Sequence, residues 1–242
     1  MKKLSEDRLD HFNVDNVEKY VGWDTIESMI RNQFLSSSFC FLDIGGGNGA
    51  FADRILEIFP ASQGTVIDNA HYQLDLNSPH PRKSTLQCSV NNMTQVLGSD
   101  RFDLIFYHWV LHHFVEKTYR ESLVTISNAL SSGRQLLSNR GVISILENCY
   151  KPVLSKALPS KIIYHTTSSK LLAAVMRLVG VNSAGTGICY LSISLWLSML
   201  KKNGFSIEKC ERMRPLQTSQ LKSWLVLSKG IDIVHFVGTL QD

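Results

Sequence analysis

A short apolar strand that runs directly into a glycine-rich turn is the feature that most limits the fold of this chain. Residues 41–49 read FLDIGGGNG, and the residues after them, up to Pro60, repeat apolar side chains at helical spacing. Because glycine has no Cβ, a ligand can approach the backbone of such a turn, and the N–H groups at the helix start are free donors. The pattern predicts a strand, a tight turn and a helix that bind a nucleotide-like ligand. A glycine turn with a purely structural role gives the same pattern.

Two ligand classes fit this turn. With Ala50 the glycines satisfy G-x-G-x-x-G/A, and Asp68 lies where an acid could contact a ribose, so NAD is one candidate. Asp43 argues against NAD, since a carboxylate there would repel a pyrophosphate and attract an ammonium group. S-adenosylmethionine carries an ammonium and a sulfonium and has no phosphate. Residues 43–49 match D-x-G-x-G-x-G, and in this motif the chain resembles the class I S-adenosylmethionine-dependent methyltransferases.

Strands and helices alternate along the rest of the chain. Further strands are expected at 64–68, 85–90, 102–107, 141–146, 205–210 and 224–229, with a helix over 109–130. This predicts an α/β fold with a doubly wound, mostly parallel seven-stranded sheet, and the resemblance implies that the last strand inserts antiparallel. We expect a single methyltransferase domain over 1–242. Its parts are an N-terminal helical cap (1–35), a cofactor-binding core (36–150), a helical insertion acting as a lid (151–190) and a C-terminal helix with strands (191–242).

Composition argues against several other classes. The formal net charge of the 242 residues is +4, but Lys and Arg are scattered, so we expect no nucleic acid partner. The start of the chain lacks the apolar stretch of a secretory signal, and the five cysteines form no C-x-x-C pair, which predicts reduced thiols and a cytoplasmic location. The longest apolar stretches are too short or too interrupted to span a bilayer, so no membrane partner is expected.

The resemblance assigns cofactor contacts to individual residues. Asp68 ends the second strand and would accept hydrogen bonds from two ribose hydroxyls, a role that suits a carboxylate; a solvated acid that starts a turn is the alternative. Ser89 stands where family members usually carry an acid for the adenine amino group, so a weaker hydroxyl acceptor is expected there. The methionine part would be held by Asp43, Gly45, Gly46, Gly47, Asn48 and Gly49, and other cofactor contacts are expected from Asn69, Val90, Tyr107 and Tyr20.

Three residues near the strand ends are candidates for the chemistry. His112 and His113 follow a strand that resembles the family's F-D-L-V segment, and either could act as a general base or pack beneath the cofactor. His108 and His112 are four residues apart, which on a helix could form part of a zinc site, but no third ligand is evident and we expect no metal. Glu147 ends the fifth strand at the ligand crevice and is a second candidate base, or else a structural carboxylate.

Together these features predict S-adenosylmethionine-dependent methyl transfer to a small molecule. Oxygen or nitrogen is the favoured acceptor atom, and the apolar insertion suggests an aromatic or lipid-like acceptor. Two alternatives stay open. One is a protein that binds S-adenosylmethionine without transferring its methyl group. The other, an NAD-dependent oxidoreductase, is weakened by the absence of a Tyr-x-x-x-Lys pair from the sequence.

Overall fold

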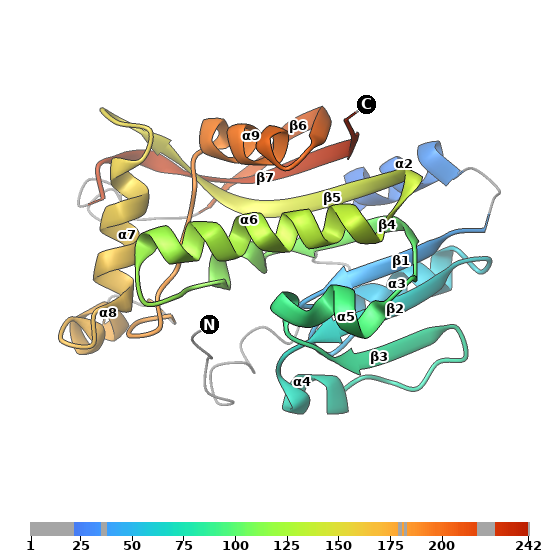
Figure 1. Cartoon of the computed structure of the whole chain (residues 1–242). Coiled ribbons are helices and arrows are strands. Elements are labelled where there is room, and N and C mark those ends of the chain that lie inside the picture. Colours follow the sequence, from blue (N-terminus) through green and yellow to red (C-terminus); the bar gives the residue numbers. More distant parts are fainter. Residues whose placement is uncertain (1–21, 35–37, 179–180, 182, 217–225, 242) are drawn as a thin grey trace.

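A seven-stranded sheet forms the centre of the molecule. The computed structural model describes residues 22–34, 38–178, 181, 183–216 and 226–241 (Figure 1). The strands are β1 (Cys40–Ile44), β2 (Gln63–Asp68), β3 (Lys83–Gln87), β4 (Phe102–His108), β5 (Leu137–Pro152), β6 (Phe205–Leu216) and β7 (Ser228–Leu240). Their order in the sheet is β3-β2-β1-β4-β5-β7-β6. The first five strands pair in parallel and β7 is antiparallel to both of its neighbours, so the predicted sheet is confirmed.

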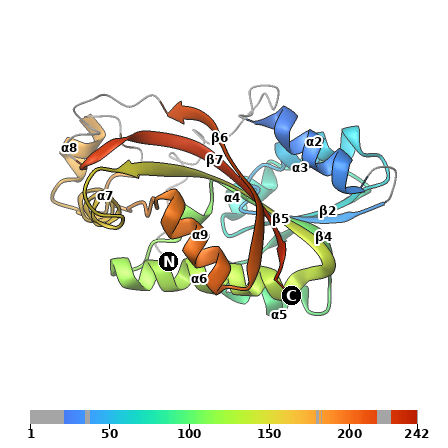
Figure 2. The same cartoon turned by 90° about the horizontal axis from the view of Figure 1, so that it is seen from above.

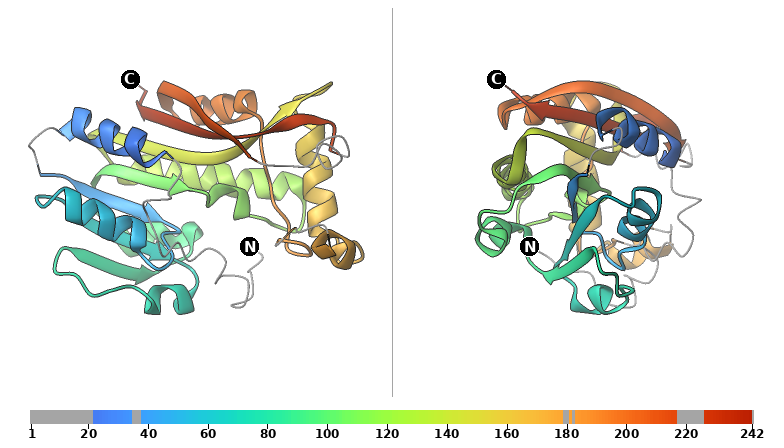
Figure 3. Two further views of the ribbon diagram at one scale, coloured as in Figure 1. Left: turned by 180° about the vertical axis from the view of Figure 1, so that it is seen from behind. Right: turned by 90° about the vertical axis from the view of Figure 1, so that its right-hand side faces the viewer.

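Helices cover both faces of this sheet (Figures 2 and 3). One face packs against α5 (Met93–Leu97), α6 (Tyr119–Leu136) and α9 (Ile193–Lys202), and the other against α2 (Trp23–Phe34), α3 (Ala50–Ile58) and α4 (His71–Asp75). Neighbouring residues of a strand therefore serve different cores. Phe41 packs on the α2 and α3 side, whereas Leu42 packs on the α6 side. Burial on both faces explains why the central strands are apolar throughout.

The start of the helix predicted over 109–130 and the position of the last strand differ from the sequence prediction. The helix expected over 109–130 does not start at Trp109, which has a φ of 53° and turns the chain into the 3-10 helix η4 (Leu111–His113). The helix α6 begins later, at a capping box formed by Thr118 and Glu121. The last strand was predicted at 224–229, but β7 occupies Ser228–Leu240. Because β7 is buried on both faces and contains Gly, Asp and His, its sequence lacks the alternation that marks a strand.

The parallel strands point toward one end of the molecule, where α7 (Leu158–Ser168) and α8 (Ala173–Leu178) lie (Figure 1). Both helices come from the 151–190 segment, which leaves the sheet at the end of β5 and returns to it at α9. The residues before 22 and those at 217–225 lie outside the described part of the chain, so the N-terminal cap predicted over 1–35 is represented by α2 alone. None of the helices in the described ranges combines the length and the apolar character needed to cross a membrane.

Candidate functional site

The turn between β1 and α3 depends on glycine at its bends. Gly45, Gly47 and Gly49 have φ angles of 73°, 53° and 74°, a left-handed region that residues with a Cβ disfavour. A Cβ on Gly45 would overlap the side chain of Val110, and a Cβ on Gly49 would overlap the amide oxygen of Asn77. The predicted strand, turn and helix unit is therefore confirmed, and larger residues would strain the turn or displace its neighbours.

Asp43 lies beneath this turn as a buried and incompletely bonded carboxylate. It is 3% exposed, and no described residue donates a hydrogen bond to its Oδ2 atom. A Cβ on Gly46 would collide with the same oxygen, so the turn passes directly over the carboxylate. Burial raises the pKa of Asp43 to about 7; the negative charge of Asp68 adds to this effect, and Lys83 opposes it. A site of this kind favours a cationic ligand.

Asp68, at the end of β2, holds the glycine turn in place. Its Oδ2 atom accepts from the N–H of Gly47 at 3.2 Å, and its Oδ1 atom accepts from the N–H of Ala70 at 2.8 Å. Burial raises its pKa, although these two N–H groups and that of Asn69 act in the opposite direction. Because a carboxylate has about four acceptor positions, Asp68 can still accept hydrogen bonds from a ligand. Both Asp68 and Asn69 are partly exposed at the strand end, as a cofactor contact requires.

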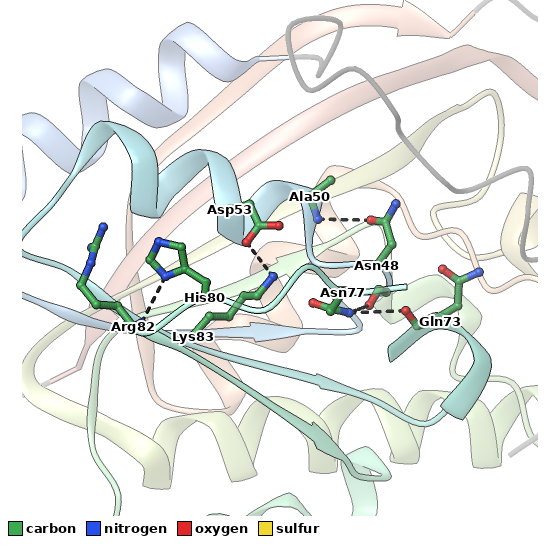
Figure 4. A network of polar contacts seen from close by, with 9 residues as sticks. Asn48, Ala50, Asp53, Gln73, Asn77, His80, Arg82 and Lys83 are labelled. Carbon is green, nitrogen blue, oxygen red and sulfur yellow. Dashed lines mark hydrogen bonds and ion pairs between the residues drawn. The ribbon is translucent and has the colours of Figure 1, made fainter. Parts of the chain in front are cut away.

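Polar side chains from α3 and from residues 77 and 83 support the glycine turn and the start of α3 (Figure 4). Asn77 donates from Nδ2 to the carbonyl oxygen of Gly47 at 2.8 Å. The buried ammonium of Lys83 lies 2.6 Å from Oδ1 of Asp53 on α3. The sequence argument missed these three side chains. Asn77 falls in a stretch without periodicity, and the other two look like ordinary surface charges on a strand and a helix.

Asn48 and Ser89 use their side chains to cap short turns. Oδ1 of Asn48 accepts from the N–H of Ala50 at 3.2 Å, where α3 begins. Oγ of Ser89 accepts from the N–H of Asn91 at 3.4 Å and caps the 3-10 helix η3 (Val90–Asn92). The strand predicted over 85–90 thus ends at Gln87, and the side chain of Val90 packs in the core. A contact of Val90 with a cofactor would have to come from its backbone.

Tyr107 does not lie where the sequence placed it. The side chain is completely buried, and its hydroxyl donates to the carbonyl oxygen of Ala129 on α6 at 2.8 Å. It therefore joins the sheet to α6 instead of facing the crevice, because residues of a strand alternate between its two faces. Tyr20, the other aromatic residue expected at the cofactor, lies outside the described residues.

Glu147 and His112 form a buried pair just beyond the end of β4. The prediction that Glu147 ends its strand is wrong, because β5 continues to Pro152 and pairs with β7 there. Oε2 of Glu147 lies 2.6 Å from Nδ1 of His112, and Oε1 accepts the N–H groups of Leu111 at 2.9 Å and of His112 at 3.3 Å. Glu147 is 0% exposed and His112 is 4% exposed. The sequence placed Glu147 at the ligand crevice as a candidate base or a structural carboxylate, and the structure surrounds it with donors from η4. The 2.6 Å contact places a proton between the imidazole and the carboxylate, and the tautomer that carries this proton on Nδ1 leaves Nε2 as an acceptor.

The other two histidines lie in different environments. His113 packs against the ring of His112 at 4.1 Å between centroids, and burial together with that neighbour lowers its pKa well below the usual value. His108 is the last residue of β4, not part of a helix, and its Nε2 atom lies 2.9 Å from Oγ of Ser144. The helical pairing of His108 with His112 is therefore wrong. In the described part of the chain no three His, Cys, Asp or Glu side chains gather as a metal site would require.

Tyr190 and Asn148 complete the surroundings of His112. The Tyr190 ring packs edge-on against His112 at 5.0 Å, and its hydroxyl accepts from Nδ2 of Asn148 at 3.1 Å. Burial raises the pKa of Tyr190 to about 12, so it keeps a proton that it can donate. Oδ1 of Asn148 is buried and has no partner among the described residues. Sequence reasoning missed Tyr190, which ends an irregular stretch far from the other site residues.

Comparison with known proteins identifies the family of this chain. The model of a protein family described as the O-methyltransferase domain matches residues 17–158, more than half of the chain. The chain belongs to this family. A malonyl-[acyl-carrier protein] O-methyltransferase of Ilyobacter polytropus is 25% identical over 175 residues, which cover 60% of this chain and 67% of the relative.

Solved structures agree on the fold of this methyltransferase. The N-methyltransferase NodS of Bradyrhizobium japonicum, crystallised with S-adenosylhomocysteine, superposes with a TM-score of 0.56 at 14% identity, covering 98% of this chain and 94% of its own. An S-adenosylmethionine-dependent methyltransferase of Mesorhizobium loti gives a TM-score of 0.60 at 16% identity, covering 92% and 100%. At these identities the similarity establishes the fold only. With the family match, it confirms the class that the turn at 43–49 predicted.

The cofactor of this methyltransferase is S-adenosylmethionine, and the residues present fit it. The partnerless Oδ2 of Asp43 would accept a hydrogen bond from the ammonium group of the methionine part, and Gly45, Gly46 and Gly47 of the turn above it have no side chains to block approach. Asp68, partly exposed at the next strand end, has acceptor positions left for ribose hydroxyls. Neither feature suits a pyrophosphate, since two neighbouring carboxylates would repel it.

Proposed function

We propose that this methyltransferase acts on a hydroxyl group of a small apolar molecule, with His112 as the general base and Glu147 as the residue that positions it. The observation that carries the proposal is the 2.6 Å contact between Nδ1 of His112 and Oε2 of Glu147. A hydroxyl is a weak nucleophile until its proton is removed, so a fixed imidazole base favours an oxygen acceptor. The match to an O-methyltransferase family supports the same acceptor atom.

The pair would work through the tautomer that Glu147 imposes. With the Nδ1 proton held by the carboxylate, Nε2 of His112 takes the proton of the acceptor hydroxyl as the oxygen attacks. The two N–H groups of η4 that bind Glu147 keep the carboxylate from rotating away. When bound, S-adenosylmethionine supplies an activated methyl group on a positively charged sulfur, which takes the electron pair of the broken carbon–sulfur bond. The remaining task of the protein is to align the acceptor and exclude water.

Groups beside His112 supply hydrogen bonds for a polar part of the acceptor. Tyr190 has a proton to donate, and Oδ1 of Asn148 has room to accept one. Ile163 and Ile188 of the 151–190 segment pack with Tyr150 in a small apolar cluster that also includes Tyr190, which supports an aromatic or lipid-like acceptor. The relative from Ilyobacter is named as an O-methyltransferase, so its methyl acceptor is also an oxygen.

Single-turnover methyl transfer tests the roles of the pair. A panel of apolar phenols, aliphatic alcohols and amines with labelled S-adenosylmethionine would first identify an acceptor. We expect His112→Ala to lower the transfer rate by about 10²–10⁴-fold, as for the loss of a general base, with the affinity for S-adenosylhomocysteine near that of the wild type. Glu147→Gln should slow transfer less, because the imidazole remains while the tautomer and orientation are no longer fixed.

His113→Ala is the matched control, since it removes a neighbouring imidazole that is not bonded to Glu147. Its transfer rate should stay within about tenfold of the wild type. If His112→Ala transfers methyl at the wild-type rate, or if only amines accept the methyl group, the proposal fails.

A further inference from the structure

The segment that carries α7 and α8 presents an unusual number of exposed apolar side chains. Twelve large apolar residues are exposed in the described part of the chain, and seven of them fall within residues 153–178. Leu171, Leu178 and Leu154 are the extreme cases, at 93%, 88% and 82% exposure. The other four are Val153, Leu158, Leu172 and Val175. Such a concentration on one segment usually marks an interaction surface.

On α8 these side chains form a stripe. Leu171, Val175 and Leu178 follow the i, i+4, i+7 spacing that places them on one side of a helix. Leu171 lies in the turn that leads into α8, which is closed by the bond from the N–H of Ala173 to the carbonyl of Lys170 at 3.4 Å. Ala173, roughly opposite the stripe, is buried and attaches the helix to the protein. The leucine stripe therefore faces away from the core.

Charge on the same segment has a single sign. The sequence contains no Asp or Glu between Glu147 and Glu208. Lys156, Lys161, Lys170 and Arg177 are exposed, and no carboxylate among the described residues forms an ion pair with any of them. On α7, Lys161 follows exposed Leu158 by three residues, so cations and apolar groups share a face. The partner that complements this surface is apolar and anionic.

We propose that residues 153–178 bind the surface of an anionic membrane, with the leucine stripe of α8 in the interface. Exposed leucines flanked by Lys and Arg are the composition of helices that lie at the boundary between headgroups and acyl chains. A second copy of the chain fits less well, because a two-fold contact through this face would oppose cations to cations. Figures 1 and 2 show α7 and α8 at one end of the molecule.

This inference changes the sequence expectation that no membrane is a partner. The periodicity argument looked for spans long enough to cross a bilayer, whereas peripheral contact needs only a short exposed stripe. The parallel strands point toward the same end of the molecule, so membrane contact would bring the crevice near lipid-like acceptors. That consequence rests on the proposed function, but membrane binding itself does not.

Co-sedimentation of the full chain with lipid vesicles tests the inference without any acceptor. We expect binding to vesicles of equal parts phosphatidylglycerol and phosphatidylcholine, weaker binding to phosphatidylcholine alone, and loss of binding at high salt. The double variant Leu171→Glu/Leu178→Glu should bind about tenfold more weakly or worse, because two apolar side chains leave the interface. Val96→Glu/Val124→Glu, two exposed valines on α5 and α6, is the matched control and should bind like the wild type.

A fluorescence measurement makes the result specific to α8. In the variant Leu171→Trp, the fluorescence of the added tryptophan is obtained by subtracting the wild-type spectrum. Its emission maximum should shift to shorter wavelength when anionic vesicles are added. Unchanged emission, equal sedimentation of the glutamate variant and the wild type, or a wild-type chain that ignores anionic vesicles would each overturn the proposal. Self-association that depends on these leucines, or binding to an acidic protein in place of vesicles, would overturn it too.

Discussion

At the scale of single residues, the least expected group is Asp43, a buried carboxylate with one oxygen lacking a partner. Burial costs free energy for a charged group, and the protein keeps this one under a turn that leaves no room for a side chain. The cost is understandable if a cationic ligand supplies the missing partner. Asp43 then lowers the stability of the free protein in exchange for ligand affinity.

The pKa of Asp43 makes this testable. Its pKa is 3.8 when unperturbed and about 7 in the folded chain, so the unfolded state ionises first as the pH rises. Between these values Asp43 lowers the free energy of unfolding progressively, and above about 7 the loss is complete. Asp43→Asn should therefore raise the thermal unfolding temperature at pH 8. The corresponding gain in the free energy of unfolding is on the order of 1–3 kcal/mol. The gain should disappear toward pH 4.

The same variant should bind S-adenosylhomocysteine about 10- to 150-fold more weakly, as for the loss of a charged hydrogen bond. Asp75→Asn, an exposed carboxylate on α4, serves as the control for both measurements. A variant that is destabilised at pH 8, or that binds as tightly as the wild type, would show that Asp43 does not act as an unpaired site for the ligand.

At the scale of elements, the sequence predicted those parts whose signal is local. The glycine turn and the first two strands follow from neighbouring residues, and both appear where expected. The helix at 109–130 was misplaced because the turn at Trp109 is set by packing at the end of β4 and not by a Gly or Pro. That turn also decides the site, since it directs His112 toward Glu147, 35 residues away in the chain. No local pattern contains such a contact.

Arg82, just before β3, ties that strand to the C-terminal end of α3. Its guanidinium donates to three carbonyl oxygens in the last turn of α3 and just beyond it, those of Leu56 at 2.6 Å, Ser62 at 2.7 Å and Phe59 at 3.2 Å. These carbonyls lie at the end of the helix, where a positive charge is favoured. We expect Arg82→Met to cost about 1.5–3 kcal/mol of unfolding free energy in denaturant titration. Cofactor affinity should change little, because the contact lies at the opposite end of α3 from the turn.

Arg54→Met is the control, because Arg54 pairs with Glu57 at the surface of the same helix. Its effect should stay below about 1 kcal/mol. Equal stability losses in the two variants would mean that the three carbonyl bonds of Arg82 contribute nothing beyond a surface charge.

At the scale of the whole molecule, the strand order explains why the site forms where it does. From β1 the chain continues to β2 and β3 on one side of β1. It then crosses to β4 on the other side, so the direction in which strands are added to the sheet reverses between β1 and β4. Crevices at such reversals bind ligands beyond the carboxyl ends of the strands. Asp43, Asp68 and Glu147 come from three different strands and reach this one edge.

This convergence was predictable from the sequence because parallel strands end at the same edge. The directions of individual side chains were not, as Tyr107 and Glu147 show, because they depend on which face of a strand each residue occupies once the whole sheet is assembled. The exposure of the leucines in 153–178 could not be predicted either, since an apolar run in a sequence does not show which of its residues lie in the core.

Calorimetric titration of the cofactor product tests the central claim most directly. S-adenosylhomocysteine should bind the wild-type chain and NAD should not. Asp68→Ala should weaken binding about 10- to 150-fold, because two ribose hydrogen bonds to a carboxylate are lost, while the exposed control Asp100→Ala should bind like the wild type. Binding of NAD with the same dependence on Asp68, or no binding of S-adenosylhomocysteine at all, would contradict the account.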